Sequence, residues 1–205
     1  MAALRVLRWL VVATAGLIAG GWLLRRGAAH AHTVGLAKVL NTDLSRLAGP
    51  IRAYAGEAEV NPVLLAAILH NESYKPHSPL LERAWQKLHR DSALGVANMH
   101  RAAYERTRRG RPFAERRWHD LAHDADLAVR AAAWHLRDLA EHLPAHGTAP
   151  YSHDGLLALG YVAGARNMLK FARGASPGPQ AGAYVERLRE YWPQARELVE
   201  PHIGR

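Results

Sequence analysis

The chain has 205 residues, of which 49% are hydrophobic, and this is enough apolar material for one folded domain with its own core. It contains no cysteine, which excludes disulfide bonds, a thiolate nucleophile and any zinc site built on cysteine. The formal net charge of +9 favours polyanionic partners, such as nucleic acid, anionic lipid headgroups or anionic wall polymers.

The first 33 residues have the composition of a signal peptide or a membrane anchor. After a short basic start, the segment Trp9–Leu24 carries no charge, and Arg25 and Arg26 follow it directly. This run is short for a membrane span, which needs about 20 residues. The triplet Ala29-His30-Ala31 has the small-residue pattern of a signal-peptide cleavage site. A cleaved signal peptide and a retained anchor both remain open, and residues 34–205 are expected to form a single domain.

The spacing of apolar residues predicts an all-α fold for that domain. No segment shows the alternating polar and apolar pattern of a β-strand. The first expected helix covers Val34–Ala55 and is ended or bent by Pro50.

A second helix is expected to begin at Asn61-Pro62, because Asn is a preferred N-cap and Pro a preferred first helical residue. The run Val63–Leu69 is apolar on every side, which predicts a buried helix. Glu72 follows Ile68 by four residues and Leu65 by seven, so it shares their helical face. Burial disfavours an ionised carboxyl and raises its pKa, and a carboxyl that stays protonated near neutral pH can act as a general acid. The alternative is that Glu72 lies beyond the helix end, in water.

Glycine, proline and capping signals divide the rest of the chain into further helices. The basic run Arg106–Arg117 is expected to be a solvated face that contacts anionic polymer or membrane. A loop is expected over residues 174–182, and Pro193 is expected to interrupt the last helix. The expected helices cover residues 78–90, 95–109, 124–142, 154–172 and 183–199.

A metal site is not expected. His119 and His123 have a spacing that can place two ligands on one helical face, with Asp120 and Asp124 beside them. The chain has 13 histidines, so this spacing arises easily by chance, and no HExxH glutamate lies between the two.

Five short segments occur in a distinctive order along residues 60–191. They are AILHNES with Glu72-Ser73, GVANM at 95–99, DLAVRAAAWHL at 126–136, GYVAG at 160–164, and a closing segment with Tyr184-Val185, Leu188 and Tyr191. In this order they resemble the lysozyme-like lytic transglycosylases, the superfamily that includes goose-type lysozyme.

The resemblance implies a lysozyme-like domain that cleaves peptidoglycan between N-acetylmuramic acid and N-acetylglucosamine, without a cofactor. Glu72 is implied as the single catalytic acid and base. The implied location is extracytoplasmic, which argues against nucleic acid as a partner and leaves anionic wall polymers or a membrane surface as further contacts. The residues implied or expected to contact substrate are Ser73, Tyr74, Gly95, Asn98, Met99 and Tyr161.

Three of these positions also have physical reasons to bind a sugar. Gly95 would let the backbone approach a sugar closely, and the Asn98 amide can both donate and accept hydrogen bonds. Tyr161 offers a flat ring and a hydroxyl, suited to a saccharide face or to orienting Glu72. The chain departs from the family pattern where Asn98 replaces Gln, Gly160 replaces Ala and Val162 replaces Asn. These departures alter the expected sugar-binding network.

Two alternatives to the lytic reaction follow. Asp91 precedes the Gly95 segment, where water-activating acids occur in relatives that hydrolyse their substrate, so a muramidase reaction assisted by Asp91 is one alternative. The other is a non-catalytic wall-binding domain on the same fold, which the replacements at Asn98 and Val162 favour.

Overall fold

The computed structural model describes residues 43–72, 93–144 and 150–200, which all belong to one unit, residues 41–205. These residues form helices and turns, with one isolated β-bridge and no strand among them, so the predicted all-α class is confirmed. No helix of these three ranges is both long and apolar enough to cross a membrane. The signal or anchor segment 1–33 and the expected helix 78–90 lie outside the described residues.

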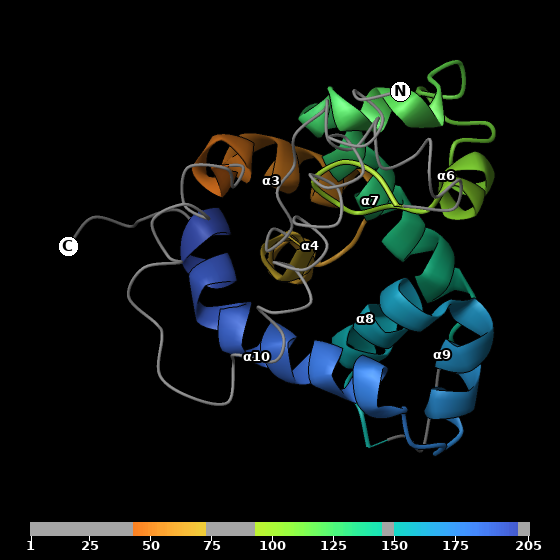
Figure 1. Ribbon diagram of the computed structural model, residues 1–205. Coiled ribbons are helices and arrows are strands. Elements are labelled where there is room, and N and C mark those ends of the chain that lie inside the picture. Colours follow the sequence, from red (N-terminus) through yellow and green to blue (C-terminus); the bar gives the residue numbers. More distant parts are fainter. Residues whose placement is uncertain (1–42, 73–92, 145–149, 201–205) are drawn as a thin grey trace, which may run out of the picture. The chain divides into compact units, whose positions relative to one another are not determined.

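The described helices follow one another in a simple order (Figure 1). Two are short 3-10 helices, η2 (Leu44–Leu47) and η3 (Trp118–Ala122). The α-helices are α3 (Ala48–Glu57), α4 (Pro62–Glu72), α6 (Arg101–Thr107), α7 (Ala125–Glu141), α8 (His153–Ala163), α9 (Ala165–Ala172) and α10 (Pro179–Val199).

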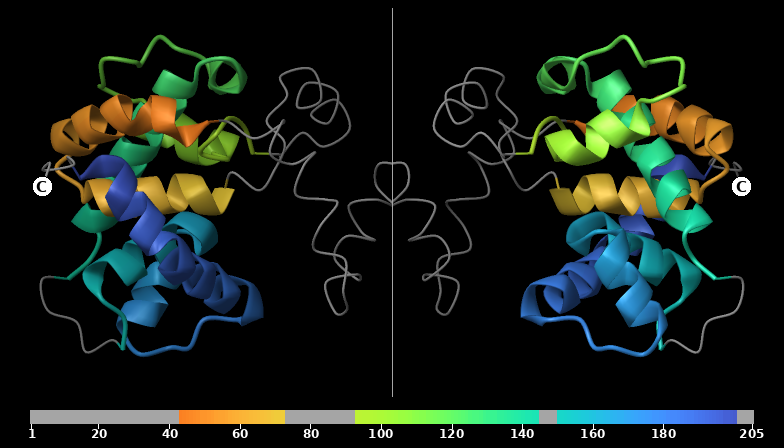
Figure 2. Two further views of the ribbon diagram at one scale, coloured as in Figure 1. Left: turned by 90° about the vertical axis from the view of Figure 1, so that its left-hand side faces the viewer. Right: turned by 90° about the vertical axis from the view of Figure 1, so that its right-hand side faces the viewer.

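Helix α4 is the centre of the described unit. It packs most extensively on α10 and also against α3 and α8, and the side views show it enclosed by these helices (Figure 2). Every residue of Val63–Leu69 is buried, as the sequence predicted. The helix begins where predicted, and the Asn61 side-chain oxygen accepts a hydrogen bond from the Val63 backbone N–H at 2.9 Å. Each fully buried leucine or isoleucine contributes about 1.5–3 kcal/mol, so this helix is a large part of the core.

Helix α7 packs against α3, α6 and α8, and its bounds agree closely with the predicted helix over residues 124–142. Asp124 caps its start by accepting a hydrogen bond from the Leu127 N–H at 2.9 Å, and the helix ends at Glu141, before Pro144. Its buried face is rich in alanine, which lets neighbouring helices approach closely.

Two predicted helices are divided or shortened by positive φ angles. The expected helix 95–109 begins only at Arg101, because Gly95 has φ +69° and Asn98 has φ +48°, both outside the helical region. The expected helix 154–172 is two helices, α8 and α9, because Gly164 between them has φ +83° and ψ 158°. The apolar periodicity of the sequence continues across Gly164, but the helical conformation of the backbone is interrupted there.

Two prolines behave differently from the prediction. Pro50 does not end a helix: it lies in the first turn of α3, where the missing backbone N–H has no helical partner to lose. The last helix starts earlier than expected, at Pro179, and continues through Pro193 to Val199. The buried residues Ala195 and Val199 hold its final turns against the core.

The basic run Arg106–Arg117 is not a uniformly solvated face. Phe113 is 2% exposed and belongs to the core. The Arg111 guanidinium forms an ion pair with Asp138 and lies over the Trp134 ring, 4.5 Å from its centroid. Part of the charge is therefore neutralised within the fold.

Candidate functional site

Glu72 is the last residue of α4, and its side chain is only 6% exposed. It lies within the helix and not beyond its end, on the face that also carries the fully buried Ile68 and Leu65. The residue before it, Asn71, is 1% exposed. The C-terminal end of a central apolar helix thus carries a carboxyl that is largely removed from water.

Residues 94–99 form a tight turn that faces this carboxyl. The backbones of Leu94 and Met99 exchange two hydrogen bonds, of 3.1 and 2.9 Å, and the Asn98 N–H donates to the Gly95 carbonyl at 2.8 Å. Asn is the residue type other than glycine that best tolerates the left-handed conformation found at Asn98. The turn therefore needs both its glycine and its asparagine.

Gly95 is required by protein packing. A Cβ atom built at this position would lie 2.4 Å from the Leu121 carbonyl oxygen in η3. Packing against Leu121 and the positive φ of +69° therefore account for the lack of a side chain at Gly95, and its contact with a sugar stays a prediction.

Asn98 binds Glu72 directly. Its side-chain amide donates a hydrogen bond to Glu72 Oε2 at 2.7 Å, across 26 residues of sequence. The amide that was expected to bind a sugar therefore holds the candidate acid. A hydrogen-bond donor at this oxygen favours the ionised carboxyl, whereas burial favours the neutral one.

Tyr161, on α8, fixes the same turn from another side. Its hydroxyl donates a hydrogen bond to the Ala97 carbonyl at 2.6 Å. Burial, and secondarily the charge of Glu72, raises the pKa of Tyr161, so the hydroxyl remains protonated and can keep donating. Glu72, Asn98 and Tyr161 thus converge around one turn. The Tyr161 hydroxyl thus holds the turn, and the contact of its ring with a sugar stays a prediction.

Met99 belongs to the hydrophobic core. Its side chain is 2% exposed, and its carbonyl accepts a hydrogen bond from the Trp118 indole N–H at 2.9 Å. The other expected contacts, Ser73 and Tyr74, and the possible second acid, Asp91, lie outside the described residues.

Tyr184 on α10 is part of this site, although its sequence position assigned it no role. Its side chain is 4% exposed, and its hydroxyl oxygen is fully buried without a well-formed hydrogen bond to any described residue. Burial first, and then the nearby Glu72 carboxyl, acting as a charge and as a poorly aligned hydrogen-bond acceptor, raises the pKa of Tyr184. Only the packing of α10 on α4 brings the two groups together, so helical periodicity could not reveal the contact.

Two further hydrogen bonds fix the end of α4 to α10. The Asn71 amide donates to the Tyr184 carbonyl at 3.1 Å, and Arg187 Nε donates to Asn71 Oδ1 at 3.1 Å. They position the backbone that carries Glu72.

His135 on α7 lies behind Tyr161, with ring centroids 5.5 Å apart. Burial lowers the pKa of His135 to about 4, so the ring is neutral at physiological pH. Its Nδ1 is 3.4 Å from the Thr107 hydroxyl, which donates to Asp138 at 3.0 Å. Sequence reasoning missed His135 because nothing in its spacing distinguishes it from the 12 other histidines.

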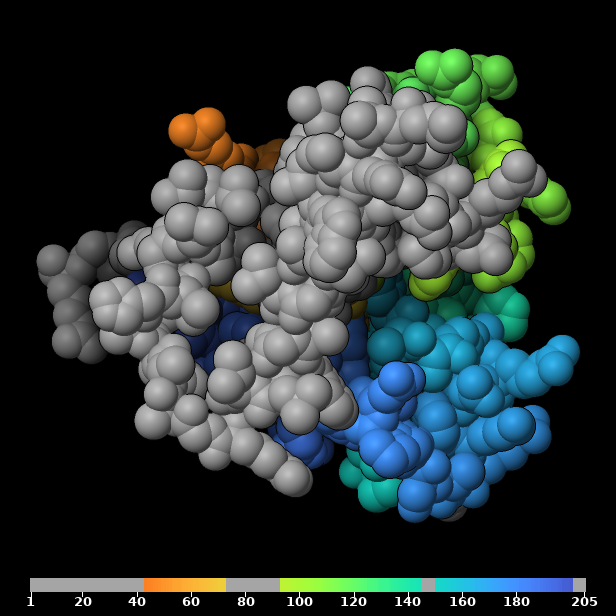
Figure 3. Space-filling model, in the orientation of Figure 1, coloured from red at the N-terminus to blue at the C-terminus, as the bar shows by residue number. Residues whose placement is uncertain are grey.

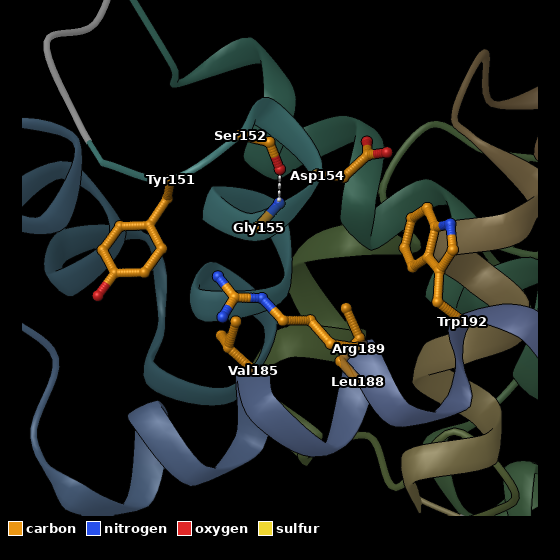
Figure 4. Close-up of a pocket in the computed structure, with 8 residues that line it drawn as sticks. All are labelled: Tyr151, Ser152, Asp154, Gly155, Val185, Leu188, Arg189 and Trp192. Carbon is orange, nitrogen blue, oxygen red and sulfur yellow. Dashed lines mark hydrogen bonds between the residues drawn. The ribbon is translucent and has the colours of Figure 1, made fainter.

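A small pocket lies away from Glu72, between the start of α8 and α10 (Figure 4). Its polar groups already serve the fold: Ser152 Oγ accepts a hydrogen bond from the Gly155 N–H at 3.1 Å, and Asp154 accepts one from Asn61 at 2.7 Å. None of the site residues predicted from the sequence lines this pocket. Its lining residues are Tyr151, Ser152, Asp154, Gly155, Val185, Leu188, Arg189 and Trp192.

Within the three described ranges, no group of three or more His, Cys, Asp or Glu side chains is arranged to hold a metal ion. Near His119 and His123, the Asp124 carboxylate forms an ion pair with Arg116 at 2.7 Å, and Asp120 is 3.5 Å from the same arginine. The acids that could have joined these histidines therefore contact a guanidinium.

No protein-family model, curated protein or solved structure matches the chain.

Proposed function

We propose that this domain cleaves glycan strands of peptidoglycan, with Glu72 as the single acid and base. The observation that carries the proposal is the Glu72 carboxyl itself, which is 6% exposed and accepts a hydrogen bond from Asn98 at 2.7 Å. Removing a carboxyl from water is costly, and titratable groups held in such environments are typical of sites kept for chemistry. The ordered segments that resemble lytic transglycosylases supply the substrate class.

The reaction needs Glu72 first to donate a proton and then to accept one. Burial favours the neutral acid and the Asn98 amide favours the carboxylate, so the two effects oppose one another. As the acid, Glu72 protonates the glycosidic oxygen, and the bond from that oxygen to the muramyl C1 breaks. As the base, it then takes the proton of the muramyl 6-hydroxyl, whose oxygen forms the new bond to C1. The product carries a 1,6-anhydro end, and Glu72 is again protonated.

The surrounding groups would keep Glu72 in position. Asn98 holds one carboxyl oxygen, and Tyr161 holds the turn that carries Asn98. Tyr184 presents a protonated hydroxyl beside the same carboxyl. A pre-positioned acid does not have to reorganise during the reaction, which is a major source of enzymatic rate enhancement.

The test is digestion of purified peptidoglycan by the full chain and by the Glu72→Gln variant. We expect the variant to lose at least about a hundredfold in rate, because general acid–base catalysis contributes that much or more. Glu190→Gln, which changes an exposed glutamate on α10, is the matched control and should keep full activity. Retained activity in Glu72→Gln would overturn the proposal.

Mass spectrometry of the products separates the lytic from the hydrolytic alternative. Anhydromuropeptides indicate the lytic route, and reducing ends indicate hydrolysis. If reducing ends appear, Asp91→Asn tests whether that carboxyl activates water, since its removal should then abolish the reaction.

A second candidate function is glycan binding without cleavage. One observation favours it: Val162, which replaces an amide residue of the family pattern, is 42% exposed and offers no hydrogen bond to a sugar. In that case the wild-type chain would co-sediment with peptidoglycan and release no soluble fragments. Glu72→Gln would leave this binding unchanged.

A further inference from the structure

We propose that the outer face of α9 is a contact surface for the headgroups of an anionic lipid bilayer. The face consists of Arg166 and Lys170 on α9 and Arg173 at its C-cap, and it is called here the α9 basic face. The inference does not depend on the proposed glycan cleavage.

The three cations share one side of a short amphipathic helix. Their spacing of four and three residues places them on the same face, and all three are exposed. The opposite side carries the buried residues Met168, Phe171 and Ala172. With a rise of about 1.5 Å per residue, the cations span about 10 Å. They therefore form one compact line of positive charge.

The α9 basic face has no acidic neighbours in sequence and no ion pairs with described residues. Between Gly155 and Val185 the chain contains no aspartate or glutamate. None of Arg166, Lys170 and Arg173 makes an ion pair with any residue that the structure describes. In the basic segment 101–117, by contrast, the sequence places Glu105 and Glu115 between the arginines, and Glu105 pairs with Arg108 at 2.6 Å.

Local helix stability does not account for this charge pattern. Cations near a helix C-terminus are favourable, which accounts for Lys170 and Arg173. Arg166, however, is the second residue of α9, where a cation is unfavourable because the helix N-terminus is itself positive. Its position therefore carries a small cost that an external anionic partner would offset.

The position of α9 leaves this face accessible. The helix packs chiefly on α8, at the edge of the described unit, and its side chains project outward in the space-filling view (Figure 3). A flat anionic surface can reach an exposed helix at an edge without rearrangement of the fold.

A bilayer is the polyanion that the sequence favours. The apolar run Trp9–Leu24, with arginines on both sides, predicts a chain that is tethered to a membrane or passes through one. Each basic residue near an anionic lipid surface strengthens binding about fivefold, so three together give about a hundredfold.

The absence of cysteine allows a site-specific test in the full chain. An Ala175→Cys substitution, at an exposed position just after α9, takes a fluorophore that is quenched by lipids with a nitroxide on the headgroup. Ala102→Cys, at an exposed position on α6, is the matched label site. Both labelled chains are mixed with vesicles of phosphatidylcholine alone or enriched in phosphatidylglycerol. Because the N-terminal segment is the same in all samples, the local quenching reports on each face separately.

We expect quenching at residue 175 that requires phosphatidylglycerol and disappears as salt rises from about 0.1 M to about 1 M. The triple substitution Arg166→Gln, Lys170→Gln and Arg173→Gln should lower the association constant for phosphatidylglycerol vesicles, obtained from quenching at residue 175, about a hundredfold. The matched control removes the same charge from α6 and the turn that follows it, as Arg101→Gln, Arg106→Gln and Arg109→Gln, and should leave quenching at residue 175 unchanged.

Three outcomes would overturn the inference. One is equal quenching at residue 175 in neutral and anionic vesicles. Another is an equal loss in the α6 control, which would show that only net charge matters. The third is a fluorescence response to polyphosphate or double-stranded DNA in detergent with none to vesicles, which would assign the face to a soluble polyanion.

Discussion

The two ends of α4 both carry polar side chains, but they use them differently. At the N-terminal end, Asn61 caps the helix and also donates to Asp154 at 2.7 Å, so its amide is satisfied by the fold. At the C-terminal end, Glu72 is a buried carboxyl, and the neighbouring Tyr184 hydroxyl lacks a well-formed hydrogen bond to the described residues.

This difference separates polar groups that stabilise the fold from polar groups that cost stability. A capping hydrogen bond, as at Asn61, stabilises a helix by about 1 kcal/mol, whereas a buried hydroxyl without a well-formed hydrogen bond, as at Tyr184, costs about 1–3 kcal/mol. Such costs concentrate at sites under functional selection. The comparison therefore supports the C-terminal end of α4, and not the small pocket near its N-terminal end, as the place for chemistry.

The largest expected effect comes from breaking the turn at the C-terminal end. Gly95→Ala would force a Cβ against the Leu121 carbonyl and strain a backbone with φ +69°, so we expect a loss of about 3 kcal/mol or more in unfolding free energy. Gly110→Ala is the control, since it has the same φ with no atom within 4 Å of the new Cβ, and should cost about 1 kcal/mol. Urea denaturation measures both. Equal losses would mean that Leu121 does not constrain the turn.

Lowering the pH should reduce the free energy of unfolding through protonation of His135, whose ring contacts Tyr161. The pKa of His135 is about 4 in the folded state, and the unfolded chain has the ordinary value near 6.5. Between these values the unfolded state binds the extra proton, so stability falls as pH drops from about 6.5 to about 4, by roughly 3 kcal/mol. His135→Gln should flatten this part of the stability profile. His153→Gln, at an exposed position, should leave it unchanged. If the stability of His135→Gln falls with pH as steeply as that of the wild type, the lowered pKa of His135 is not the cause.

At the N-terminal end, Asn61→Ala should destabilise the protein without affecting the site. It removes the cap of α4 and the hydrogen bond to Asp154, and we expect a loss of about 1–2 kcal/mol in thermal or urea unfolding. Turnover of peptidoglycan at a temperature where the variant is folded should match wild type. A specific loss of turnover would erase the distinction between the two ends.

The smallest expected effect is a gain, not a loss, in the free energy of unfolding. Tyr184→Phe removes a buried hydroxyl that lacks a well-formed partner among the described residues, so stability should rise by up to about 1 kcal/mol or stay the same. Tyr104→Phe is the matched control, because the Tyr104 hydroxyl donates to the Arg116 carbonyl at 3.1 Å and its loss should cost about 1 kcal/mol. If Tyr184→Phe destabilises as much as the control, the Tyr184 hydroxyl is well bonded in solution.

The sequence alone determined the features that depend on neighbours a few residues apart. The all-α class, the start of α4 at Asn61-Pro62, the burial of its apolar run and the helical face of Glu72 all follow from capping and periodicity. The limits of α7 follow in the same way, from Asp124 and the apolar stripe behind it.

Only the tertiary structure decided which groups surround Glu72. Asn98 reaches it across 26 residues of sequence, and Tyr161 reaches the turn across 64. The break at Gly164 and the turn at Gly95 depend on positive φ angles, which glycine permits but does not require. Periodicity records which side of a helix is buried, but not which helix covers it, so the contacts of the site are settled by packing.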